Sequence, residues 1–254
     1  MPEWIQETKA HFIRWLIHLK REPFSMAFSL LNPVILLIFM GGAFQSLARA
    51  SIGQDYRAYL LPGILALTVL GNSLSGGISL LFDKENGFLS RVMSTPTSRA
   101  SILVGRFLAV NVSTILQCSM MLGLGFLFGV PIATGVKGVF GLLGIGLLLS
   151  FGVTILSLTL AFVLTNHGDF FAILGITVLP AGFLSSAFVP LDSLAPWMRL
   201  LAQANPMTYA VDGMRSLILS GGDGAALLRM AVVLLVFDGA ALWLGMRVFR
   251  RQLA

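Results

Sequence analysis

Six runs of mostly apolar residues, each long enough to cross a lipid bilayer, limit what this chain can fold into. They cover residues 24–44, 58–82, 101–128, 138–164, 169–189 and 226–247. A membrane-spanning helix needs about 20 such residues. Strands that cross a bilayer alternate apolar and polar residues, whereas these runs are continuously apolar. The sequence therefore predicts an all-α membrane protein with six transmembrane helices in a single domain.

Composition argues against a soluble fold. Charged residues make up 11% of the chain and the mean hydropathy is +0.88, whereas soluble domains carry about 25% charged residues. The net charge is +6, but Lys and Arg lie in short connections rather than on one polar face, so no nucleic-acid partner is expected. The only cysteine, Cys118, lies inside an apolar run, which excludes an intramolecular disulfide.

The distribution of Lys and Arg predicts the orientation in the membrane. Six spans place both termini on the same side. Eleven of the 17 basic residues lie in the N-terminal arm, in residues 83–106 or at the C-terminus, against six in the opposite connections. Because Lys and Arg accumulate in cytoplasmic loops, we expect both termini to face the cytoplasm and the chain to lie in the cytoplasmic (inner) membrane. The N-terminus lacks the order of a signal peptide, so it is expected to be retained.

Residues 1–22 predict a helix that lies in the membrane interface. Trp4, Phe12 and Trp15 recur at helical spacing on one face, and charged residues recur on the other. An amphipathic helix with aromatic and basic residues is typical of contact with lipids at a membrane surface. Pro23 then ends this helix and redirects the chain into the first span.

Residues 190–224 predict short helices before the last span. The segment is moderately apolar, but it is interrupted by Pro190, Pro196 and Pro206. Each piece is too short to cross a bilayer. We therefore expect re-entrant or interfacial helices on the extracytoplasmic side.

The connection between the second and third spans reads DKENGFLSRVMSTPTSR over residues 83–99. Asp83 can begin a short helix, which Thr95 before Pro96 would end. Its apolar stripe consists of Phe88, Leu89, Val92 and Met93. Spacing alone leaves two interpretations open, because such a stripe either floats in the lipid interface or is gripped by another protein.

The stretch ENGFLSRVMSTPTSRASILVGR resembles the cytoplasmic-loop motif of ABC-2 type exporter permeases. The matching residues are Glu85, Gly87, Arg91, Thr95-Pro96, Arg99 and Gly105-Arg106. Phe88 stands where a small polar residue is commoner. A second stretch, NPMTYAVDGMRSLIL over residues 205–219, is similar to the signature before the last span of these proteins. The resemblance covers nearly the whole chain and is closest to daunorubicin-resistance-type drug or lipid exporter permeases.

This resemblance implies the membrane subunit of an ATP-driven exporter of an amphipathic drug, lipid or glycolipid. Such a subunit works as a dimer, here expected to be a homodimer, with ATP-binding cassette ATPase subunits that grip the 83–93 helix. The residues implied in that contact are Glu85, Gly87, Phe88, Leu89, Arg91, Val92, Met93, Pro96 and Arg99. The phosphate-binding pattern G-x-x-x-x-G-K-[ST] does not occur in the chain. ATP and Mg are therefore expected on the partner, and this chain is expected to bind no cofactor and to be no enzyme.

Small polar residues in the spans have two possible roles. One stripe in the second span consists of Thr68, Asn72, Ser75 and Ser79, and Asn32 is a further candidate in the first span. A similar stripe in the fourth span consists of Gly146, Ser150, Thr154 and Ser157. Residues of this kind usually serve close helix packing in lipid. Alternatively, the second-span stripe and Asn32 line a substrate pathway between two protomers.

Two other classes of function predict features that are not visible here. A secondary transporter or channel, which needs no ATPase, would show inverted repeats and paired intramembrane charges. A membrane enzyme would show a catalytic constellation, but His11, His18 and His167 are scattered. Asp238, in the sixth span, is a single intramembrane carboxylate that serves either internal hydrogen bonding or an ion relay.

Overall fold

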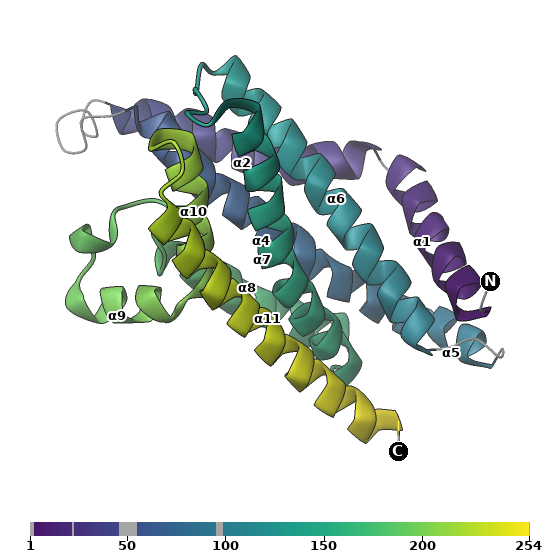
Figure 1. The fold of residues 1–254 in the computed structure, drawn as a ribbon. Helices are drawn as coiled ribbons and strands as arrows, with labels where there is room; N and C mark the ends of the chain where they lie inside the picture. Colours follow the sequence, from purple (N-terminus) through teal and green to yellow (C-terminus); the bar gives the residue numbers. More distant parts are fainter. Residues whose placement is uncertain (1–2, 22, 46–54, 95–98, 254) are drawn as a thin grey trace.

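The computed structural model describes residues 3–21, 23–45, 55–94 and 99–253, and every element in these ranges is helical (Figure 1). This confirms the all-α prediction for the described residues. The elements are α1 (Glu3–Arg21), α2 (Pro23–Ala43), α4 (Tyr56–Glu85), α5 (Phe88–Met93), α6 (Arg99–Leu127), α7 (Gly135–Val163), α8 (His167–Phe183), the 3₁₀ turn η1 (Leu191–Ser193), α9 (Pro196–Ala204), α10 (Pro206–Leu219) and α11 (Gly224–Leu253).

Four of these helices are long and apolar enough to cross a membrane. They are α4, α6, α7 and α11, and they match four of the predicted spans. Shorter apolar helical stretches, Phe28–Ala43 in α2 and His167–Phe183, lie in the other two windows. The expected extent of the fifth run, 169–189, is wrong at its end. The helix stops at Phe183, and Asn205 Nδ2 donates to the carbonyls of Ala181 (2.8 Å) and Leu184 (2.7 Å), which have no helical partner because the helix ends.

α4 is the central helix of the bundle and contacts α2, α6, α7, α8 and α10. Most of its residues are buried, which explains why its sequence is largely apolar apart from the stripe of small polar residues. At Gly77, a Cβ atom would lie 2.4 Å from Ser157 Oγ of α7. Only glycine therefore allows α4 and α7 to approach as closely as they do.

Hydroxyl groups hold α7 against α4 inside this apolar core. Ser73 Oγ donates to Ser150 Oγ (2.9 Å). Ser157 Oγ donates to the carbonyl of Leu74 (2.7 Å) and accepts from the amide of Gly77 (3.1 Å). The packing interpretation is therefore confirmed for the small-residue stripe of the fourth span.

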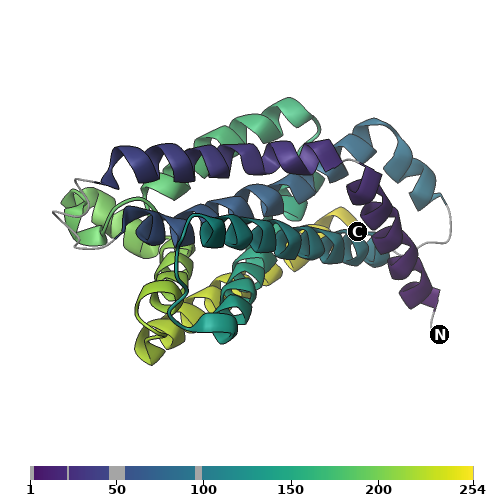
Figure 2. The same cartoon turned by 90° about the horizontal axis from the view of Figure 1, so that it is seen from above.

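Both termini and α5 lie toward one end of the bundle, which we call the α5 end, whereas α9 and the connection before α7 lie toward the other (Figure 1). α1 makes a sharp angle with α2 (Figure 2) and packs along α6. The N-terminal amphipathic helix is confirmed as a helix. So are two short helices, α9 and α10, which meet at Asn205 before the last span.

Candidate functional site

The corner between α4 and α5 lies where the sequence predicted the helix gripped by a partner. The prediction that Asp83 begins this helix is wrong, because Asp83, Lys84 and Glu85 continue α4. Asn86 caps α4, and Gly87 has a φ of +69°. This left-handed conformation favours glycine and ends a helix. A separate helix of six residues, α5, therefore begins at Phe88.

Asp83 is the centre of an ionic cluster that joins three helices. Its Oδ2 lies 3.1 Å from Nη2 of Arg106 in α6, and its Oδ1 lies 3.3 Å from Nη2 of Arg14 in α1. The Arg106 side chain is 3% exposed and that of Arg14 is 41% exposed. A guanidinium buried this deeply is stable only with a partner of opposite charge, so Asp83 holds Arg106 in place.

Aromatic rings extend this cluster to α1 and α5. The Arg106 guanidinium lies 3.9 Å from the ring centre of Trp15, and that of Arg14 lies 3.8 Å from the ring centre of Phe88. Both distances are within the range of a cation–π interaction. α1 can lie this close to α6 because Gly105 has no side chain there, and a Cβ would be 2.8 Å from Cβ of His11. Burial, followed by repulsion from Arg14, lowers the pKa of His11, which favours the neutral imidazole in this contact.

The last turn of α4 is also tied to the connection between α7 and α8. Lys84 Nζ donates to the carbonyls of Phe162 (3.3 Å) and Leu164 (2.8 Å). A Glu85 oxygen accepts from the backbone amide of His167 (2.8 Å), and both oxygens lie within 3.0 Å of His167 Nδ1. Glu85, which the resemblance assigned to the ATPase contact, is therefore bound within this chain. His167 is the first residue of α8.

The other predicted contact residues lie on or near α5. Arg91 is exposed and Val92 is half-buried. Leu89 and Met93 belong to α5, and Arg99 begins α6. Pro96 lies outside the described residues. Arg14, Trp15, Asp83 and Arg106 were not among the predicted contact residues, although Arg106 was recognised as the last residue of the motif.

A second feature is a cavity of about 460 Å³ between α2, α4 and α8, with Gln117 of α6 at its side. Four of the five predicted pathway residues line it: Asn32, Thr68, Asn72 and Ser75. Much of the remaining wall is apolar, and Phe183 and Phe188 contribute aromatic rings. The structure thus brings together residues from the two spans that the sequence named as one lining, and it adds a wall from α8 within the same chain. Ser79, one turn beyond Ser75, is not part of the lining.

Asn72 combines the two roles that the sequence left open. Its Nδ2 donates to Thr114 Oγ1 (2.8 Å) and its Oδ1 accepts from Ser113 Oγ (2.9 Å), so it joins α4 to α6 while it lines the cavity. The hydroxyls of Thr68 and Ser75 donate to carbonyls of their own helix. Hydroxyls satisfied in this way make a weakly polar wall that can accept further contacts.

The segment 205–219 organises the opposite end of the bundle. Asn205 Oδ1 accepts from the amide of Met207 (3.0 Å) and so caps α10, while its Nδ2 binds the last carbonyls of α8. Pro206 occupies the first position of α10, where its missing N–H costs nothing. The Asn-Pro pair of this motif therefore serves to join α8 to α10.

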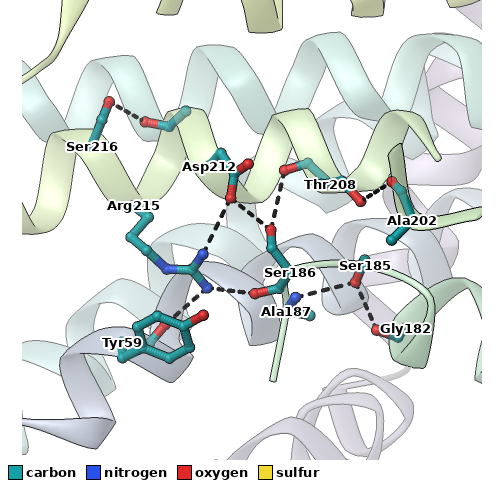
Figure 3. A network of polar contacts seen from close by, with 11 residues as sticks. Tyr59, Gly182, Ser185, Ser186, Ala187, Ala202, Thr208, Asp212, Arg215 and Ser216 are labelled. Atoms are coloured by element: carbon teal, nitrogen blue, oxygen red, sulfur yellow. Dashed lines mark hydrogen bonds and ion pairs between the residues drawn. The ribbon is translucent and has the colours of Figure 1, made fainter. Parts of the chain in front are cut away.

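Arg215 holds the chain between α8 and η1 against α4 and α10 (Figure 3). Its Nη2 donates to the Ser186 carbonyl (2.6 Å), and its Nη1 lies 3.2 Å from Asp212 Oδ1. Ser186 Oγ donates to the same Asp212 oxygen (2.7 Å). The guanidinium also lies 3.9 Å from the ring centre of Tyr59. Sequence reasoning recognised this motif but not the roles of Asp212 and Arg215, whose spacing of three residues on one helix was the available signal.

Asp238 lies in the contact between α11 and α7. It is 5% exposed, and its Oδ1 has no hydrogen-bond partner within the described residues. A Cβ on Gly152 would be 2.4 Å from this oxygen, so the glycine makes room for the carboxylate. No group of His, Cys, Asp and Glu side chains that could hold a metal ion occurs in the part of the chain that the structure describes.

The sequence matches the family described as ABC-2 type transporter over residues 6–219. A protein of Pyropia yezoensis named as a transport permease, ycf38, is 33% identical over 217 residues, which are 84% of this chain and 74% of that protein. The daunorubicin resistance ABC transporter permease DrrB1 of Streptomyces coeruleorubidus is 26% identical over 84% of this chain and 75% of its own.

A third relative, from Mycobacterium tuberculosis, is named as the doxorubicin resistance ABC transporter permease DrrC. It is 24% identical over 90% of this chain and 83% of its own length. These matches confirm the resemblance and disfavour both a transporter without an ATPase and a membrane enzyme. The chain therefore belongs to the ABC-2 type transporter family and is a membrane subunit of an ABC transporter.

Proposed function

We propose that this permease exports an amphipathic drug, lipid or glycolipid across the cytoplasmic membrane, driven by a separate ATP-binding cassette ATPase that grips α5. The observation that carries this proposal is the attachment of α5. Phe88 of α5 contacts Arg14 of α1, and Arg14 and Arg106 share the carboxylate of Asp83. A displacement of α5 by the ATPase would therefore be transmitted to α1, α4 and α6 by side-chain contacts.

The proposed topology has six spans: α2, α4, α6, α7, α8 and α11. α8 has 17 residues, the lower limit for a span, and α2 has 21. The bias of Lys and Arg assigns the α5 end to the cytoplasm. Both termini lie toward that end (Figure 1), as an even number of spans requires. α9 and α10 would then lie at the extracytoplasmic side as interfacial or re-entrant helices.

The cavity between α2, α4 and α8 is the proposed substrate pathway. Apolar side chains with a few amide and hydroxyl groups suit an amphipathic molecule that carries little charge. The names of two relatives, which refer to daunorubicin and doxorubicin resistance, support a drug as the substrate. The pathway would be completed by a second copy of this chain in a homodimer. ATP and Mg would bind the ATPase, and this subunit would take no part in hydrolysis.

The coupling role of α5 predicts that Val92→Asp lowers ATP-driven transport about tenfold or more. A carboxylate on the apolar stripe would have to be buried in the ATPase groove, and a single buried anchor contributes about 2 kcal/mol to an interface. The measurement is doxorubicin uptake into inside-out vesicles that contain the permease and its co-purified ATPase.

The matched control for Val92→Asp is Val136→Asp. Val136 is 74% exposed near the start of α7, toward the other end of the bundle, so the same change there should leave transport within twofold. Membrane insertion of both variants is checked by their yield and melting temperature. Coupling by α5 is disproved if Val92→Asp transports like the unmodified chain, or if the two variants lose transport equally.

The pathway role of the cavity predicts that Ser75→Trp blocks transport while ATP hydrolysis continues. An indole at this exposed position on the cavity wall would occupy much of its volume. Ser79→Trp is the control, since Ser79 lies one turn away and does not line the cavity. Transport of doxorubicin and of a fluorescent phospholipid should fall about tenfold or more only in Ser75→Trp. Equal transport by both variants would contradict the assignment of this cavity as the pathway.

A further inference from the structure

The last helix, α11, has one face packed in the bundle and another that is apolar and exposed. The packed face contains Leu234, Asp238 and Ala241, and farther along it Phe249 meets the ring of Phe162 in α7. The exposed face contains Leu228, Val232, Leu235, Val236, Trp243 and Met246, each more than half exposed. In a membrane-spanning helix, an apolar face of this kind is in contact with lipid.

Two arginines end the exposed face at the α5 end of the bundle. Arg247 and Arg250 are one helical turn apart and line an open cavity of about 530 Å³ together with Trp243 and Met246. The Arg247 guanidinium lies 5.2 Å from the centre of the Trp243 ring. Within the described ranges, no carboxylate forms an ion pair with either arginine. The cavity therefore has an apolar wall and two positive charges that no carboxylate of the described residues pairs with.

We propose that this cavity binds the headgroup of an anionic phospholipid, whose acyl chains lie along the exposed face of α11. Two guanidinium groups on one helical face present paired N–H donors that fit phosphate oxygens. Trp243 is a residue type enriched at the level of the headgroups. A soluble anion would pair with the two arginines, but it would not cover the apolar wall of the cavity or the exposed apolar side chains of α11. Charge and shape together thus favour an anionic lipid over free phosphate or a zwitterionic lipid.

The proposal does not depend on the coupling role of α5 or on the transported substrate. It is tested on the purified permease in detergent, by titration with palmitoyl-oleoyl-phosphatidylglycerol and detection of bound lipid by native mass spectrometry. Parallel titrations use the corresponding phosphatidylcholine and the soluble headgroup analogue glycerol 1-phosphate. Replacing both arginines, Arg247→Gln with Arg250→Gln, should weaken phosphatidylglycerol binding about thirtyfold, since each basic residue near a membrane surface contributes about 1 kcal/mol.

The matched control removes two positive charges at the other end of the bundle, by Lys137→Gln with Arg229→Gln. Both side chains are exposed, and this variant should bind phosphatidylglycerol within threefold of the unmodified permease. Melting temperatures in phosphatidylcholine show that both double variants are folded. Equal loss in the two double variants, unchanged binding in the arginine variant, or equal binding of phosphatidylcholine would each overturn the proposal. So would competition by glycerol 1-phosphate at the concentration at which the lipid binds.

Discussion

Replacing Arg215 by alanine is expected to destabilise the permease by about 3–5 kcal/mol, because it removes a guanidinium that is 15% exposed together with its charged hydrogen bonds, each of which contributes about 1.5–3 kcal/mol. Asp212, whose side chain is 42% exposed, would lose its charged partner but stay in contact with solvent. The Ser186 carbonyl, 2.6 Å from Nη2, and the Tyr59 carbonyl, 3.4 Å away, would lose a charged donor. The measurement is thermal unfolding of the purified variant in detergent, followed by circular dichroism.

Arg199→Ala is the matched control for Arg215→Ala. Arg199 pairs with Asp192 beside α9, but the side chains are 39% and 94% exposed. Exposed pairs contribute about 0–1 kcal/mol, so this variant should melt close to the unmodified chain. If the two variants lost the same stability, the network around Arg215 would not be what holds the segment after α8 in place.

Replacing Asp83 by asparagine should have the second largest effect, a loss of about 3 kcal/mol of stability together with weaker transport. Asparagine keeps the shape of the side chain but removes the charge that compensates Arg106, which is 3% exposed. The same change removes the ion pair between Asp83 and Arg14. The contact of α4 with α1, and the position of the Arg14 guanidinium beside Phe88, are weakened as a result. Melting temperature and the ratio of substrate transported to ATP hydrolysed are both measured.

The control for Asp83→Asn is Arg14→Gln, which removes the more exposed partner of the same carboxylate. Its effect on stability should stay below about 1 kcal/mol, while some coupling is still lost because Arg14 also contacts Phe88. The double variant shows whether the two changes act on one interaction, since their effects then do not add. Additive effects would mean that Asp83 does not link α1 to α6.

Much of the fold followed from the apolar pattern, but the exact ends of the helices did not. Long apolar runs predicted α4, α6 and α7 within three residues at each end, because every backbone group in a membrane must be paired within a helix; α11 extends six residues beyond its predicted end. The start of α5 was misplaced by five residues, from Asp83 to Phe88, because local propensity allows Asp83 either to begin a helix or to continue one. In the structure Asp83 continues α4, and from there it pairs with Arg14 and Arg106, which are distant in the sequence.

The sequence by itself determined the class of this protein, its helices and the two motifs that identify its family, because membrane insertion and local propensity act on contiguous residues. It also named four residues of the first and second spans that share one cavity, although not that α8 would enclose it with them. Only the tertiary structure decided which charges meet. Arg14, Asp83 and Arg106 come from three different helices. Arg215 donates to the carbonyl of Tyr59, 156 residues earlier in the chain, and to that of Ser186, 29 residues earlier. Such pairs form only after the helices pack, because packing removes the charged groups from water. In the low dielectric of the interior an unpaired charge is costly, so each charge is stable only beside a group of opposite charge.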